Sequence, residues 1–189
     1  MKPSAAFFWQ KLDHPGHDSC RLFKRTGGWR LTGASVFFEA DRPCHFQYEV
    51  VTDAAWRTRR ASVTGYLGSR AVDLRISAAG RGHWKVGNVL QSNLSGCVDV
   101  DLGFTPATNL IVIRRLALAI GEGAEAPAAY LAFPRMRFVK LPQRYHRIGK
   151  TEFDYAAPTV GYAGTLKVLP SGAVAHYPGL FTLVTGTRH

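Results

Sequence analysis

Residues 108–120 read Thr-Asn-Leu-Ile-Val-Ile-Arg-Arg-Leu-Ala-Leu-Ala-Ile and break an otherwise alternating pattern. Apolar side chains recur there at spacings of three and four residues, the period of an α-helix, at Leu110, Ile113, Leu116, Ala117 and Ile120. Thr105 or Thr108 can cap the start of this helix, and Gly121 and Gly123 are expected to stop it. Because most of the remaining positions are also apolar, the helix is expected to be enclosed by the rest of the protein.

The segments around this helix alternate apolar and polar residues with a period of two, which is typical of strands with one packed face. Examples are Phe46-x-Tyr48-x-Val50, Val72-x-Leu74-x-Ile76 and Val98-x-Val100-x-Leu102. The 19 Gly and 10 Pro are spread along the chain, which favours many turns and few helices. The sequence predicts a mainly β fold: a single domain over residues 1–189, with a large antiparallel sheet curled around one helix at about 108–120.

Composition restricts the class of partner more than it restricts the fold. Hydrophobic residues make up 46% and charged residues 20%, an ordinary globular profile. The formal net charge is +11, which favours polyanions, anionic surfaces or phosphorylated ligands, and the alternative is general solubility. A curled sheet with a single helix inside it is expected to leave a cleft lined by apolar and aromatic side chains.

Cysteine usage and the N-terminus bear on the compartment. Cys20, Cys44 and Cys97 are widely spaced and odd in number, so we expect reduced, buried thiols rather than a disulfide framework. The apolar run before Gln10 and Lys11 is too short for a signal peptide, and no stretch reaches transmembrane length. These features predict a cytoplasmic protein without a membrane span.

Asp99 and Asp101 are the first candidate functional residues. They are two positions apart in an alternating segment, so both side chains should leave the same face of a strand. Arg114 and Arg115 are their nearest cationic partners if the turn at 103–106 folds the helix back over that strand. Three interpretations stay open: a glycosidase-like carboxylate pair, carboxylates that accept hydrogen bonds from ligand hydroxyls, and a structural Asp–Arg network.

Two basic segments are the next candidates. Trp56, Arg57 and Arg59 place an indole beside guanidinium groups, which suits a ring-bearing or phosphate-bearing ligand, although a solvated strand face also fits. Residues 135–150 contain no acid and interleave basic residues with Phe138 and Tyr145, as single-stranded nucleic-acid surfaces do. Since no recognition motif accompanies them, nucleic-acid binding is only an alternative hypothesis.

Motifs for metals, cofactors and familiar enzymes are missing from the sequence. Residues 13–18, Asp-His-Pro-Gly-His-Asp, resemble metal ligands, but Pro-Gly makes them a turn and no distant Cys/His group accompanies them. The Gly121-x-Gly123 pair follows the predicted helix, so it is a stop signal and not a phosphate loop. We therefore expect no metal, no cofactor and no catalytic residue.

A longer pattern carries a family resemblance. Residues 96–109 read Gly-Cys-Val-Asp-Val-Asp-Leu-Gly-Phe-Thr-Pro-Ala-Thr-Asn, and Ile-Arg-Arg-Leu follows at 113–116. Further matches are Trp29-x-Leu31-x-Gly33, Trp56-Arg57-Thr58-Arg59, Gln143-x-Tyr145 and Tyr177-Pro178-Gly179-Leu180. This pattern resembles a bacterial family, formerly of unknown function, of glycolipid-binding proteins. The resemblance implies a sheet rolled spirally around one helix, a glycolipid ligand and a homodimer.

The leading hypothesis is non-catalytic binding of an amphipathic, anionic ligand in a cleft between sheet and helix. The candidate ligand contacts are Trp56, Arg57, Arg59, Asp99, Asp101, Arg114, Arg115 and Tyr145. The alternatives are a hydrolase that acts on a glycosidic or ester bond through Asp99 and Asp101, and a nucleic-acid binder that uses residues 135–150.

Overall fold

The computed structural model describes residues 2–80 and 82–188, so residues 1, 81 and 189 of the predicted domain lie outside the described part. Most of the chain forms one sheet whose neighbouring strands all pair antiparallel. In spatial order its strands are β10 (Gly123–Glu125), β13 (Arg144–Arg147), β14 (Glu152–Ala157), β15 (Tyr162–Val168), β16 (Val174–Tyr177), β17 (Phe181–Arg188), β1 (Ala5–Lys11), β2 (Gly16–Arg25), β3 (Gly28–Glu39), β4 (Arg42–Asp53), β5 (Thr58–Leu67), β6 (Arg70–Ala78), β7 (Trp84–Val86) and β8 (Val89–Gln91).

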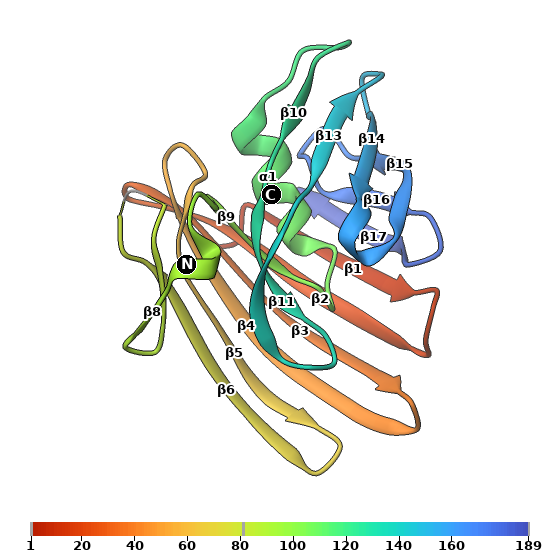
Figure 1. Ribbon diagram of the computed structural model, residues 1–189. Helices are drawn as coiled ribbons and strands as arrows, with labels where there is room; N and C mark the ends of the chain where they lie inside the picture. Colours follow the sequence, from red (N-terminus) through yellow and green to blue (C-terminus); the bar gives the residue numbers. More distant parts are fainter. Residues whose placement is uncertain (1, 81, 189) are drawn as a thin grey trace.

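A second, small sheet lies inside the curl of the first. It consists of β12 (Arg137–Leu141), β11 (Ala128–Ala132) and β9 (Asp99–Leu102), and β9 runs parallel to β11. Helix α1 (Ala107–Leu116) follows β9 and lies against the inner face, with β1–β6 on one side and β13–β17 on the other (Figure 1). Two short 3-10 turns, η1 (Ser92–Leu94) and η2 (Pro158–Val160), complete the described elements. The predicted mainly β fold, with a large antiparallel sheet curled around one helix, is confirmed.

The helix differs from its prediction at both ends. It begins at Ala107, whose N–H donates to the hydroxyl of Thr105 at 3.1 Å. It ends at Leu116 rather than 120, because Ala117 takes the left-handed conformation (φ 47°) and its N–H bonds to the Ile113 carbonyl at 3.1 Å. The helical period continued past this point in the sequence, but Ile120 is 57% exposed and does not share the buried face. The expectation that the helix runs to 120 is wrong.

Bulky side chains fill the interior between helix and sheet. Every residue of α1 from Ala107 to Ile113 is buried, and so are Trp9, Phe46, Trp84 and Phe104 from the surrounding elements. The two indole N–H groups donate to backbone carbonyls, Trp9 to Val174 at 2.6 Å and Trp84 to Cys97 at 3.0 Å. Burying a tryptophan with its N–H satisfied makes each of these rings a strong core contact. The three cysteines are buried free thiols, as expected.

Gly33 leaves room for the Tyr48 side chain, which connects the sheet to the residues before α1. The Tyr48 ring lies across this glycine from the neighbouring strand, and a Cβ at position 33 would come within 2.3 Å of that ring. Only glycine leaves room for the crossing. The Tyr48 hydroxyl donates to Asp18 at 2.7 Å and lies 3.2 Å from the hydroxyl of Thr105, just before α1. The strands β2 and β4 and the helix entry therefore share one buried polar contact.

Candidate functional site

A cleft of about 720 Å³ opens where the C-terminal end of α1 meets strands β14 and β15. Its apolar lining comes from Ile113, Leu118, Phe153, Val168 and Leu169, of which only Leu169 is more than slightly exposed. Three cations also line it, and Arg114 and Lys150 among them are exposed. The cleft therefore combines an apolar lining with positive charges, which suits an apolar ligand with an anionic end.

Arg147, the third cation, holds the frame of this cleft. Its guanidinium donates to three carbonyl oxygens, those of Leu118 at 2.8 Å, Gly149 at 3.1 Å and Lys150 at 2.9 Å. It also lies 5.7 Å from the ring of Phe153. These three hydrogen bonds attach the segment after α1 to the turn before β14. Because the acceptors are neutral carbonyls, the guanidinium keeps its positive charge. Arg147 is thus a fixed positive centre beside the apolar lining.

Arg114 connects the cleft to a pair of stacked tryptophans. Its guanidinium lies 5.4 Å from the Trp56 ring, and Trp56 stacks on Trp29 at 4.6 Å with 16° between the planes. The side chain also runs along the turn at Gly172, where a Cβ would come within 3.2 Å of it. Trp56 itself has a positive φ of 64°, unusual for a residue with a side chain, which aims the indole inward. The guanidinium beside Trp56 is therefore that of Arg114, whereas the sequence had suggested Arg57 and Arg59.

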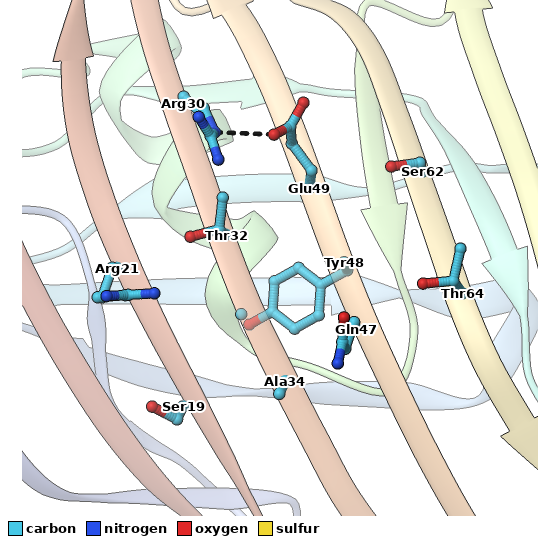
Figure 2. A pocket seen from close by; sticks show the side chains of 11 residues that line it. Ser19, Arg21, Arg30, Thr32, Ala34, Gln47, Tyr48, Glu49, Ser62 and Thr64 are labelled. Atoms are coloured by element: carbon cyan, nitrogen blue, oxygen red, sulfur yellow. Dashed lines mark ion pairs between the residues drawn. The ribbon is translucent and has the colours of Figure 1, made fainter. Parts of the chain in front are cut away.

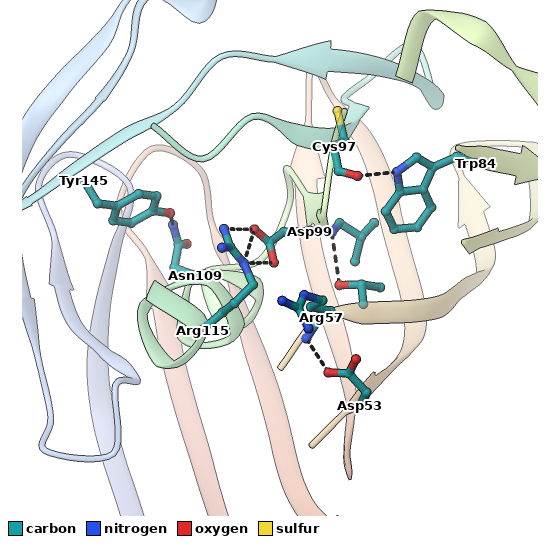
Figure 3. A network of polar contacts seen from close by, with 10 residues as sticks. Asp53, Arg57, Trp84, Cys97, Asp99, Asn109, Arg115 and Tyr145 are labelled. Atoms are coloured by element: carbon teal, nitrogen blue, oxygen red, sulfur yellow. Dashed lines mark hydrogen bonds and ion pairs between the residues drawn. The ribbon is translucent and has the colours of Figure 1, made fainter. Parts of the chain in front are cut away.

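Asp99 and Arg115 form a closed ion pair that attaches β9 to α1 (Figure 3). The Arg115 Nε donates to the two Asp99 oxygens at 2.9 and 3.0 Å, and Nη2 donates at 2.6 Å. Asp99 is fully buried, and burial raises the pKa of its carboxyl while Arg115 opposes that shift. The contact between a carboxylate of this strand and an arginine of the helix, which the sequence suggested at this corner, is thus present between Asp99 and Arg115.

Asp101 and Tyr145 have different partners from Asp99. The Asp101 carboxylate accepts hydrogen bonds from the Gln143 amide and from the Thr108 hydroxyl, and its burial raises its pKa to about 6. The fully buried Tyr145 accepts a bond from Asn109 at 2.9 Å (Figure 3). The carboxylates and the phenol are thus engaged by the protein, in positions that hold α1 against β9 and β13.

The two remaining predicted contacts, Arg57 and Arg59, lie apart from the cleft. Arg57 and Arg59 are exposed. Asp53 accepts a bond from the Arg57 backbone N–H at 2.9 Å (Figure 3) and one from the Arg59 guanidinium at 2.8 Å. Both arginines line a smaller recess of about 260 Å³ beside Trp84. The structure therefore separates them from Arg114, which lines the larger cleft.

The basic stretch 135–150 is also divided by the fold. Arg137 and Lys140 lie on β12 of the small sheet, whereas Arg144 and Arg147 lie on β13 of the large one. Sequence reasoning missed Arg147 and Lys150 as neighbours of α1, since their only signal was their membership of that stretch. In the turn at 13–18, which resembles metal ligands in sequence, His14 lies between Asp13 at 3.0 Å and Glu39 at 3.1 Å. Within residues 2–80 and 82–188, no cluster of three or more potential metal ligands occurs.

Known proteins give three comparisons. Residues 6–182 match the model of the family described as "Putative glycolipid-binding". A crystal structure of a DUF1089 family protein from Pseudomonas aeruginosa is similar, with a TM-score of 0.78 and 28% identity over 87% of this chain and 91% of that one. No curated protein matches. The helix in the described part of the chain is too short and too polar to span a bilayer. Because the family model spans almost the whole sequence, the chain belongs to the family described as "Putative glycolipid-binding".

Proposed function

We propose that this protein binds, without catalysis, an amphipathic anionic ligand whose acyl portion enters the cleft at the end of α1. The observation that carries the proposal is that an apolar lining, including Phe153 and Leu169, shares one cleft with Arg114, Arg147 and Lys150. Apolar burial supplies affinity in proportion to the area covered, and the cations select a negative head. Membership of a family described as glycolipid-binding supports the same class of ligand.

The predicted contacts divide into two roles under this proposal. Arg114 contacts the anionic group of the ligand. The Trp56 ring, 5.4 Å from the Arg114 guanidinium, holds that guanidinium in place. Asp99, Arg115, Asp101 and Tyr145 fix the helix that forms one wall. Arg57 and Arg59, with their Asp53 partner, add to the positive field beside the tryptophans. The non-catalytic assignment is supported by the engagement of both carboxylates with donors from the protein itself.

A direct test compares two lysophospholipids with the same acyl chain, one with an anionic glycerol head and one with a zwitterionic choline head. We expect the wild type to bind the anionic lipid at least several-fold more tightly, measured by calorimetry below the micellar concentration. The double variant Arg114→Gln with Lys150→Gln should lose this preference while it still binds the choline lipid. Leu169→Ser should weaken both lipids alike, because it removes apolar lining.

The matched control is Arg75→Gln with Lys167→Gln, which removes the same two charges from exposed positions on β6 and β15. If this control abolishes the preference as completely as the cleft variant does, net charge rather than the cleft selects the ligand. Equal affinity of the wild type for the two lipids would overturn the anionic assignment, and no binding of either would overturn the cleft as an acyl site.

A further inference from the structure

The outer face of the sheet, opposite α1, carries a second depression of about 760 Å³ across strands β2–β5. Figure 2 views it with the helix behind the sheet. Two rows of side chains cross it, Ser19–Ala34–Gln47–Thr64 and Arg21–Thr32–Glu49–Ser62, as the strand register places them. The small side chains of these rows leave a broad hollow between the longer Arg21, Gln47 and Glu49. We call this depression the outer groove.

The polar groups of the outer groove are largely unused by the protein. Among the hydrogen bonds found within residues 2–80 and 82–188, none involves the side chain of Ser19, Thr32, Gln47, Ser62 or Thr64. Four hydroxyls and one carboxamide therefore face one hollow with their donors and acceptors free. Groups that can both donate and accept, set close together, match the hydroxyl pattern of a sugar ring.

The charged groups of the outer groove are held in place. The Glu49 carboxylate forms an ion pair with Arg30 at 2.7 Å and lies 3.5 Å from Arg60, so two cations hold it in place (Figure 2). Arg21 forms no ion pair among the described residues, and both Arg21 and Arg30 lie 5.8 Å from the Phe23 ring. Planar carboxylate and guanidinium groups can each form two hydrogen bonds to adjacent hydroxyls, and the unpaired Arg21 can take a carboxylate.

Aromatic rings border one side of the outer groove. The next row along the strands contains His17, Val36, His45 and Tyr66, where His17 stacks on Phe8 at 5.1 Å and Tyr66 is 43% exposed. Exposed aromatic faces pack against the C–H face of a sugar ring, as they do against other amphipathic surfaces. The outer groove thus combines hydroxyls, oriented charges and a flanking aromatic row.

From this combination we propose that the outer groove binds a saccharide, with Arg21 contacting an acidic substituent such as a uronate carboxylate. This site lies on the opposite face of the sheet from the cleft and is independent of it. A soluble sugar without an acyl chain is therefore a sufficient ligand, and binding at the outer groove goes beyond the amphiphile binding proposed above.

The test uses ¹⁵N-labelled full-length protein titrated with a panel of neutral trisaccharides and their uronate counterparts at millimolar concentration. We expect backbone signals of β2–β5 to shift, with a preference for the acidic sugars. Ala34→Ile, a β-branched residue that suits a strand and fills the floor, should weaken binding by about tenfold or more. Arg21→Gln should abolish the preference for acidic over neutral sugars and leave neutral binding within about twofold.

Matched controls on the same outer face are Ala71→Ile and Arg75→Gln on β6, outside the outer groove. They should bind as the wild type does, and all four variants should keep the lysophospholipid binding of the cleft. If no sugar of the panel shifts the β2–β5 signals, or if Ala71→Ile weakens binding as much as Ala34→Ile, the proposal fails. Loss of lipid binding alone would count against the cleft and not against the outer groove.

Discussion

At the scale of single residues, Asp18 is the most unusual group in the core. It is fully buried on β2, and one carboxylate oxygen accepts the Tyr48 hydroxyl at 2.7 Å while the other has no hydrogen-bond partner in the described chain. Burial is the main cause that raises the pKa of this carboxyl to about 7, against the hydrogen bond from Tyr48 and the charge of Lys11. The folded protein therefore keeps this proton at a pH where the unfolded chain has lost it.

This shift has a definite sign in stability. Because the folded-state pKa is raised, stability from this group is present below pH 4 and declines as pH rises to about 7. We expect Asp18 to lower the free energy of unfolding by about 2–3 kcal/mol between pH 5 and pH 8, and Asp18→Asn to remove that decline. Urea denaturation at the two pH values measures it. Asp73→Asn, an exposed carboxylate on β6, is the control, and an unchanged pH dependence in Asp18→Asn would contradict the assignment.

At the scale of elements, the end of α1 shows how the cleft is formed. Ala117 reverses the chain in the left-handed region, after which Leu118 turns into the core and its carbonyl accepts Arg147 at 2.8 Å. Glu122 accepts the N–H of Ala119 at 2.8 Å and closes the turn. The helix thus ends at Leu116, and Ala117 and Leu118 of the turn that follows line the cleft.

The left-handed residue at 117 leads to a prediction. An L-residue with a Cβ is disfavoured at φ 47°, and glycine is the usual residue at this position after a helix. Ala117→Gly should raise the free energy of unfolding by about 0.5–1 kcal/mol, measured by urea denaturation. Ala119→Gly, at an exposed neighbour without a positive φ, should not stabilise the protein. A loss of stability in Ala117→Gly equal to that in Ala119→Gly would show that the turn is not strained.

The periodicity of the sequence predicted the strands and the helix but not most of the contacts between distant elements. Alternation at 46–50 and 72–76 predicted strands, and three- and four-residue spacing predicted α1, because both signals are local. The pair Asp99–Arg115 was foreseeable for the same reason, since one short turn separates β9 from α1. The sequence predicted a cleft between sheet and helix but not its place at the end of α1, because that cleft joins 113–118, 147–153 and 168–172 through sheet closure. The crossing of Tyr48 over Gly33 depends likewise on strand pairing that spacing alone does not fix.

At the scale of the whole molecule, the interior is filled while the proposed sites lie at its surface. Trp9, Phe46, Trp84 and Phe104 are all at most 1% exposed, so the sheet and helix pack on each other without a guest between them. The cleft and the outer groove lie on opposite faces of one sheet. Ligand binding should therefore add to a structure that already exists, because a close-packed core retains its stability when a surface cleft is empty.

This leads to a prediction for the ligand-free protein. After extraction of any co-purifying lipid, the chain should keep its near-ultraviolet circular dichroism and unfold cooperatively. Adding back the anionic lysophospholipid at a hundredfold excess over its Kd should raise the free energy of unfolding by about 2.7 kcal/mol, the value that linkage sets for one site that exists only in the folded state.

The loss of stability and of near-ultraviolet signal when the lipid is extracted distinguishes a lipid bound in the surface cleft from one that forms part of the core. If the lipid were part of the core, its removal would expose the aromatic interior, the protein would bind a hydrophobic dye and the near-ultraviolet signal would collapse. The loss would then exceed what linkage allows at that ligand concentration. Because the largest rings already contact one another, Phe46 with Phe104 at 4.8 Å and Tyr145 with Tyr155 at 4.8 Å, we expect the signal to persist and only the midpoint of unfolding to move.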